Sequence, residues 1–208
     1  MNWLWISGWA VPPAWLAAQA QAVWPEARHA AVAPADAARA LNSEKFNVLG
    51  GYSLGALWLL HQEKAISDKI PVLLLAPIFA FTTPGGRGGR TAPAQLRLQR
   101  RRLRDQPAAA IADFYQRTKL AELAQDPATA QWNSARHEDL AEELAWLETW
   151  RAGPPPPHWH GFAGSEDPLL DAAGLKKFWP LLRIVPGTGH TPGPLMNAAR
   201  ESFTGEKR

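Results

Sequence analysis

The chain of 208 residues contains no cysteine. This absence excludes disulfide bonds, thiolate metal ligands and a cysteine nucleophile together, and it is compatible with a reducing compartment. A chain of this length suffices for one α/β domain with a modest insertion, and the core of such a domain needs no covalent cross-links.

The N-terminus lacks the features of a targeting segment. Residues 1–6, Met-Asn-Trp-Leu-Trp-Ile, have no basic start, and their apolar run is too short for a signal peptide or a membrane span. We therefore expect a soluble, cytoplasmic protein that does not enter a membrane.

Acidic residues are absent from residues 85–104, a segment that holds seven arginines. The formal net charge of the whole chain is only +3, so its basic character is local. We expect any acidic partner to dock at this segment.

Apolar runs alternate with helical patterns in two parts of the chain, before residue 84 and after residue 157. The run at residues 71–77 is continuously apolar, as is typical of a central parallel strand covered on both faces. This alternation predicts an α/β protein with one doubly wound, mostly parallel sheet. The expected strands are 3–7, 29–33, 46–50, 71–77, 158–163 and 181–185, and the expected helices are 13–23, 36–41, 56–61 and 172–179.

The alternation stops between residues 84 and 157. That segment opens with a loop rich in glycine and arginine and closes with four consecutive prolines. We therefore expect a helical cap, residues 84–157, inserted into a core domain of residues 1–83 and 158–208. The expected cap helices are 94–104, 108–124, 128–132 and 138–150.

Residues 51–55 read Gly-Tyr-Ser-Leu-Gly and stand between an expected strand and an expected helix. A strand that turns this sharply into a helix forces the serine into a strained conformation, and only small flanking residues allow the turn. Ser53 is therefore the expected nucleophile, above the positive end of the following helix. The alternative for such a pentapeptide is a chance glycine-serine turn.

Two further residues complete a serine-hydrolase constellation. A serine hydroxyl needs a histidine that accepts its proton and a carboxylate that orients the histidine. Asp167 follows the strand at 158–163, and His190 follows the strand at 181–185. The chain order Ser53, Asp167, His190 is that of the α/β-hydrolases. The alternatives are a turn residue for Asp167 and a surface-loop histidine for His190.

Acyl transfer also requires an oxyanion hole, which consists of two N–H groups that face the developing negative charge. We expect one from the backbone of Leu54, directly after the nucleophile, and the other from the backbone of Trp9, in the loop after the first strand. The alternative for Trp9 is ordinary core packing. This chemistry requires no metal and no cofactor.

Six segments carry a resemblance to a known family. They are 6–10 (Ile-Ser-Gly-Trp-Ala), 51–55, 164–168 (Gly-Ser-Glu-Asp-Pro) and 187–190 (Gly-Thr-Gly-His), together with the lid segments 95–103 and 111–115. They resemble the corresponding motifs of the pimeloyl-acyl carrier protein methyl ester esterases of biotin synthesis. The resemblance covers nearly the whole chain; the triad motifs are common to the entire superfamily, and the Gly-Trp loop and the lid point to this branch.

The resemblance implies an α/β-hydrolase fold and a serine carboxylesterase that hydrolyses the methyl ester of pimeloyl-acyl carrier protein. Two positions depart from the family's pattern. Ser7 stands where many relatives have histidine, and Ala10 stands where several have glycine. The loop can still work because its donors are backbone groups.

Four arginines of the first cap helix are spaced to form one stripe. Arg97, Arg100, Arg101 and Arg104 fall at i, i+3, i+4 and i+7. Such a stripe suits docking of an acyl carrier protein, which is acidic and carries a phosphate on its prosthetic arm. The alternatives are a solvated face and a nucleic-acid surface, although no nucleic-acid-binding motif accompanies the arginines.

Two other functions stay open: a general short-chain carboxylesterase or thioesterase acting on small-molecule esters, and a hydrolase-fold binding protein that no longer turns over. His158 and His160 share a strand face, but no third ligand is evident, so we expect no metal site. Six aromatic residues could line an acyl pocket or merely fill the core: Trp58, Phe79, Phe81, Phe114, Tyr115 and Trp132.

Overall fold

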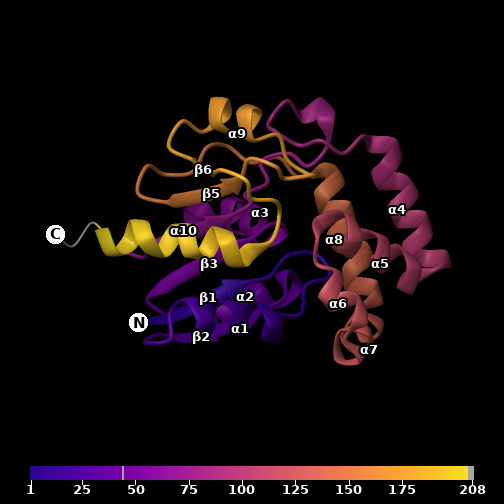
Figure 1. The fold of residues 1–208 in the computed structure, drawn as a ribbon, viewed down its shortest axis with the longest axis horizontal. Helices are drawn as coiled ribbons and strands as arrows, with labels where there is room; N and C mark the ends of the chain where they lie inside the picture. Colours follow the sequence, from indigo (N-terminus) through magenta and orange to yellow (C-terminus); the bar gives the residue numbers. More distant parts are fainter. Residues whose placement is uncertain (44, 206–208) are drawn as a thin grey trace.

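The computed structural model describes residues 1–43 and 45–205, and in these ranges six parallel strands form one sheet (Figure 1). The strand order is β2-β1-β3-β4-β5-β6. The predicted α/β class is thereby confirmed, and the ends of the expected strands are shifted by at most two residues. The strands are β1 (Asn2–Ile6), β2 (Arg28–Val32), β3 (Val48–Tyr52), β4 (Val72–Leu75), β5 (His160–Gly164) and β6 (Arg183–Val185).

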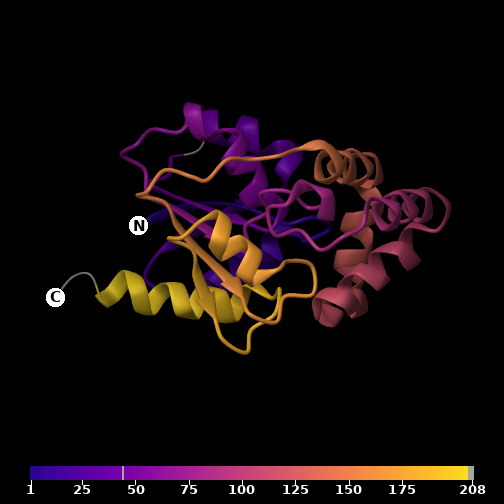
Figure 2. The same ribbon diagram turned by 90° about the horizontal axis from the view of Figure 1, so that it is seen from above.

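Helices cover both faces of this sheet, as the doubly wound prediction requires. Helix α1 (Pro13–Val23) packs on β2 and on the C-terminal helix α10 (Pro192–Gly205), which in turn contacts β4 and β5. Helix α3 (Leu54–His61) packs on β1 and β3 from the other face, and Figure 2 shows it across the sheet from the yellow α10. The remaining core elements are α2 (Ala37–Ser43), α9 (Ala172–Phe178), and the short 3-10 helices η1 (Pro34–Asp36), η2 (Glu63–Ala65) and η3 (Thr83–Gly85).

Helix α10 is not among the predicted elements. Its first residues, Pro-Gly-Pro at 192–194, have the composition of a loop, yet proline is tolerated in the first turn of a helix because the N–H groups there have no partner within the helix. Leu195, Met196 and Ala199 are fully buried. Packing of this apolar face against the core, rather than local propensity, accounts for the helix.

Five α-helices follow η3 between β4 and β5 in the described chain, and they gather at one end of the sheet (Figure 1). The predicted inserted helical cap is therefore present, whereas its bounds at 84 and 157 stay a prediction. The predicted core domain runs to residue 208, and its residues 44 and 206–208 lie outside the described residues. The cap helices are α4 (Pro93–Asp105), α5 (Pro107–Thr118), α6 (Ala121–Gln125), α7 (Pro127–Ala135) and α8 (His137–Thr149).

The expectation of one continuous helix over 108–124 is wrong. Helix α5 ends because Lys119 adopts a left-handed backbone conformation with φ 58°, and the N–H of Leu120 donates to the carbonyl of Tyr115 at 2.8 Å. The turn lets Leu120 and Leu123 both reach the core, where their exposed fractions are 1% and 2%. Their burial offsets the cost of a non-glycine residue in this conformation.

None of the helices that the structure describes combines the length and the apolar character needed to cross a membrane.

A cluster of ionisable side chains, of which Glu143 is the buried member, joins the cap to the core. Glu143 of α8 is 2% exposed, and its carboxyl group accepts a hydrogen bond from the backbone N–H of Ala35 in η1. Arg136 lies beside it and contacts Asp36 of the core and Asp139 of the cap, both at 2.8 Å. Burial raises the pKa of Glu143 to about 8, a rise that Arg136 opposes. Glu143 is therefore mostly protonated at neutral pH.

We predict that Glu143 makes the protein less stable as the pH rises. Its pKa is higher in the folded state than in the unfolded chain, so its stabilising contribution is complete below the unfolded pKa and is lost as the pH rises through about 8. Between pH 6 and pH 9 the free energy of unfolding should fall by about 3 kcal/mol from this group alone. Urea unfolding at the two pH values measures the change.

The substitution Glu143→Gln keeps the shape and removes the titration, so it should flatten this dependence. Glu138→Gln, at an exposed position of the same helix, is the matched control and should leave the dependence intact. An unchanged pH slope in Glu143→Gln would contradict the prediction.

Candidate active site

The Gly-Tyr-Ser-Leu-Gly segment forms the tight turn between β3 and α3. Ser53 has φ 55° and ψ −114°, a conformation in which a residue with a side chain is strained. A Cβ atom at Gly55 would lie 2.1 Å from the carbonyl oxygen of Ile6, so the first turn of α3 rests directly on the end of β1. Ser53 is therefore held at the carboxyl edge of the sheet, at the N-terminus of α3.

His190 links this serine to Asp167. The His190 Nε2 atom lies 2.9 Å from Ser53 Oγ, and Nδ1 lies 2.7 Å from Asp167 Oδ2. The loops that carry Asp167 and His190 touch at Gly164, where a Cβ atom would lie 2.1 Å from the carbonyl oxygen of Thr188. The structure thus brings together the three residues predicted from the sequence, while their catalytic roles stay a prediction.

Asp167 is held by backbone groups as well as by His190. Its second carboxylate oxygen, Oδ1, accepts from the backbone N–H groups of Leu169 at 2.8 Å and Leu170 at 3.1 Å. We assign the ring proton of His190 to Nδ1, facing Asp167 Oδ2, so that Nε2 is the acceptor that faces Ser53. Asp167 and His190 are 0% and 1% exposed, so this chain of hydrogen bonds is shielded from water.

Tyr52 is a supporting residue that the sequence did not reveal. Its hydroxyl donates to the backbone carbonyl of His190 at 3.0 Å and so ties the end of β3 to the histidine loop. Burial, with a smaller contribution from the charge of Asp167, raises the pKa of Tyr52 well above its ordinary value, so the phenol keeps its proton. Tyr52 occupies a variable position of the motif, and only the fold brings it beside His190.

The two expected oxyanion donors both adjoin Ser53. Leu54 is the first residue of α3, and the N–H groups of a helix's first turn have no partner within the helix. Gly8 packs against Ser53, since a Cβ atom at Gly8 would lie 3.2 Å from Ser53 Cβ. Trp9 follows directly. The position of both residues is compatible with the predicted role, which stays a prediction.

Helices α5 and α8 of the cap pack against Trp9. The indole Nε1 donates to the carbonyl of Leu140 in α8 at 2.9 Å, and the ring meets Phe114 of α5 edge to face at 4.8 Å between centroids. A cavity of ≈ 20 Å³ remains between Trp9 and the cap. This volume has room for about one water molecule. Besides Trp9, its lining consists of the apolar residues Phe81, Leu96, Phe114, Leu144 and Leu147 and the polar residues Thr91, Gln95, Gln99 and Arg117.

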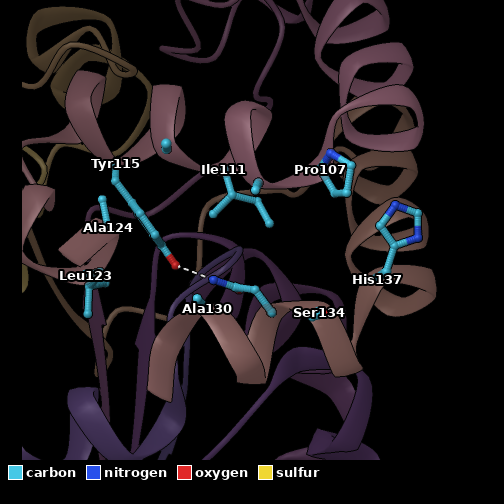
Figure 3. A pocket seen from close by; sticks show the side chains of 11 residues that line it. Pro107, Ile111, Tyr115, Leu123, Ala124, Ala130, Ser134 and His137 are labelled. Carbon is cyan, nitrogen blue, oxygen red and sulfur yellow. Dashed lines mark hydrogen bonds between the residues drawn. The ribbon is translucent and has the colours of Figure 1, made fainter. Parts of the chain in front are cut away.

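The six aromatic residues considered as lining of an acyl pocket lie in different parts of the structure. Phe81 and Phe114 line the cavity beside Trp9, whereas Trp58 and Phe79 are buried in the core. Tyr115 lines a second pocket of ≈ 270 Å³ inside the cap, between α5, α6 and α7 (Figure 3). Trp132 lines a groove against α1. The aromatic residues therefore do not form one acyl pocket in this conformation.

The four stripe arginines line one surface groove of ≈ 420 Å³, together with His137 and Ala141 of α8. Leu96 and Leu103, on the other side of α4, are buried. Glu148 partly neutralises the groove because it pairs with Arg100 and lies 4.0 Å from Arg97. The groove is suited to an acidic partner, and the docking itself stays a prediction.

No group of three or more His, Cys, Asp or Glu side chains that could hold a metal ion occurs within residues 1–43 and 45–205.

A parallel sheet with a strained serine after β3, and with a histidine and an aspartate after later strands, defines the architecture of the α/β-hydrolases. A model described as Alpha/beta hydrolase family matches residues 6–202, and the chain belongs to that family. No curated protein matches the chain at a significant level of sequence similarity.

Solved structures of several enzymes share the fold. RhEst1, an esterase from Rhodococcus sp. ECU1013, has a TM-score of 0.65 at 14% identity over 98% of this chain and 90% of its own. A thermophilic esterase from Thermogutta terrifontis has a TM-score of 0.61 at 14% identity, over 100% of this chain and 89% of its own. The RedJ thioesterase from Streptomyces coelicolor has a TM-score of 0.58 at 14% identity, over 99% of this chain and 85% of its own. At these identities the likeness concerns the fold alone.

We predict that Gly164→Ala separates the histidine and aspartate loops. The added methyl group must displace the backbone oxygen of Thr188, so the protein should lose about 1–3 kcal/mol of stability. Labelling of Ser53 by a fluorophosphonate probe should slow on the order of 100-fold, because small displacements of reacting groups are costly. Gly153→Ala is the control, since a Cβ atom there meets nothing within 4 Å. Equal labelling rates in the two variants would refute the prediction.

Proposed function

We propose that the protein is a serine carboxylesterase in which Ser53 is the nucleophile. The observation that carries this proposal is the continuous hydrogen-bonded chain from Ser53 Oγ through the His190 ring to Asp167 Oδ2. It supplies a proton acceptor for the serine and a buried carboxylate for the histidine, which is the arrangement that acyl transfer requires.

The reaction follows from these contacts. His190 Nε2 takes the Ser53 proton as Oγ attacks the ester carbonyl, and Asp167 stabilises the imidazolium that forms. The N–H groups of Leu54 and Trp9 bind the negative oxygen. His190 then gives its proton to the departing alcohol. Water, deprotonated by the same nitrogen, attacks the acyl-enzyme and releases the acid.

As substrate we propose the methyl ester of pimeloyl-acyl carrier protein, a cytoplasmic step of biotin biosynthesis that yields methanol and pimeloyl-acyl carrier protein. Two features support this assignment: the sequence resemblance described above, and the basic groove lined by Arg97, Arg100, Arg101 and Arg104. Bidentate guanidinium groups suit both the acidic carrier and the phosphate of its arm.

A general short-chain carboxylesterase or thioesterase is the second candidate. Esterases and a thioesterase occur among the proteins of similar fold. Glu148 also neutralises part of the groove that a carrier protein would use, because it pairs with Arg100 and lies 4.0 Å from Arg97. The intact contacts from Ser53 through His190 to Asp167 favour turnover over a silent binding protein.

We predict that wild-type protein cleaves the carrier-bound methyl ester and that Ser53→Ala reduces this activity by at least about 1,000-fold. Release of methanol is the measurement, with p-nitrophenyl butyrate run in parallel. Cleavage of the small ester alone would be consistent with Ser53 as nucleophile and would exclude the biotin assignment. Turnover by Ser53→Ala equal to wild type would refute the proposed mechanism.

A second prediction concerns the groove. The double substitution Arg97→Glu/Arg101→Glu should raise KM for the carrier-bound ester by about 10-fold or more and leave p-nitrophenyl butyrate hydrolysis unchanged, because only the large substrate needs the groove. Lys64→Glu/Lys69→Glu changes the same charge after α3, at the far end of that helix from Ser53, and should have no effect. Equal kinetics in both double variants would exclude docking at this groove.

A further inference from the structure

Ala10, directly after Trp9, has a strained backbone conformation. Its φ of 55° lies in the left-handed region, which a residue with a Cβ atom occupies at a cost of about 1–2 kcal/mol. The loop itself contributes one hydrogen bond, from the Val11 N–H to the Gly8 carbonyl at 3.2 Å, and neighbouring segments supply the other contacts. Ala10 is fully buried, so these contacts come from protein groups rather than from solvent.

Tyr115 of α5 supplies such a contact across the boundary between cap and core. Its hydroxyl donates to the carbonyl oxygen of Ala10. The same hydroxyl accepts a hydrogen bond from Asn133 Nδ2 of α7 at 2.8 Å, which Figure 3 shows as a dashed line. The Ala10 oxygen can only accept, so the phenol must donate to it and the Asn133 amide nitrogen must donate to the phenol.

Two features keep this link intact. Tyr115 is 1% exposed, so water does not compete effectively for its hydroxyl. Burial raises its pKa to about 12, so the hydroxyl keeps its donor hydrogen at any pH at which the protein would work.

The cap also holds the Trp9 side chain. Helix α8 accepts the indole N–H at Leu140, and Phe114, next to Tyr115 in α5, packs edge to face on the indole ring. The cap thus contacts the loop at two consecutive residues, through the ring of Trp9 and the backbone of Ala10.

We infer that Tyr115 is a positioning residue for the oxyanion hole, whose hydroxyl holds Ala10 in the left-handed conformation and so fixes the orientation of the Trp9 N–H. This inference rests on the proposed function. The oxyanion hole is then complete only while the cap packs against the core. Moving α5 away would break the Tyr115–Ala10 hydrogen bond and release the strained loop.

A double-mutant cycle with Tyr115→Phe and Ala10→Gly tests the inference. Tyr115→Phe should lower kcat for p-nitrophenyl butyrate by about 10-fold or more and change KM by less than about 2-fold, because the lost contact acts on the transition state. In the Ala10→Gly background the same substitution should cost less than about 3-fold, since glycine adopts a positive φ without support.

Thr118→Val is the matched control. Thr118 is buried in the same helix, and its hydroxyl donates to carbonyl groups of that helix and not to the loop. It should lower stability in urea unfolding by an amount comparable to Tyr115→Phe and leave kcat unchanged. A loss of kcat in Thr118→Val equal to that in Tyr115→Phe would overturn the inference. An equal loss for Tyr115→Phe with and without the Ala10→Gly substitution would overturn it as well.

Ser53→Ala, measured alongside, distinguishes failure of the proposed function from failure of the inference about Tyr115. Full activity in Ser53→Ala would refute the proposed function and the inference with it. An inactive Ser53→Ala together with an unaffected Tyr115→Phe would refute the inference alone.

Discussion

The close approach of the first turn of α3 to the end of β1 is the constraint on which the site depends. With no side chain at Gly55, the helix rests on the carbonyl of Ile6. Ser53 is thereby forced into its strained conformation, and β1, the loop with Trp9 and the helix N-terminus all meet at one point. The parallel sheet then brings the loops after β5 and β6 to the same edge, where Asp167 and His190 reach the serine.

Much of this arrangement could be read from the sequence because it follows from local patterns and one topological rule. Apolar runs locate the strands, and the carboxyl ends of parallel strands share one edge, so residues after three such runs must converge. The glycines at 51 and 55 mark the sharp turn. This reasoning needs no knowledge of which side chains touch. It predicts that Ser53, Asp167 and His190 lie together, as they do, while their catalytic roles stay a prediction.

The parts that the sequence did not reveal depend on contacts between distant segments. Tyr52 and His190 are 138 positions apart, and Tyr115 and Ala10 are 105 apart. Nothing near Glu143 in the sequence indicates its burial, because its hydrogen-bond donor is the backbone N–H of the distant Ala35. The break at Lys119 has no glycine to mark it, and α10 begins with residues typical of a loop. In each case tertiary packing overrides a local signal.

The place where the cap enters the chain has a consequence for how this protein could vary. The cap leaves the core after β4 and returns at β5, and these strands are direct neighbours, paired from Leu73 with His160. An insertion between two paired strands changes no register elsewhere in the sheet. Cap helices could therefore lengthen, shorten or be exchanged as a block during divergence while the serine, histidine and aspartate keep their places, which would let substrate preference change independently of the chemistry.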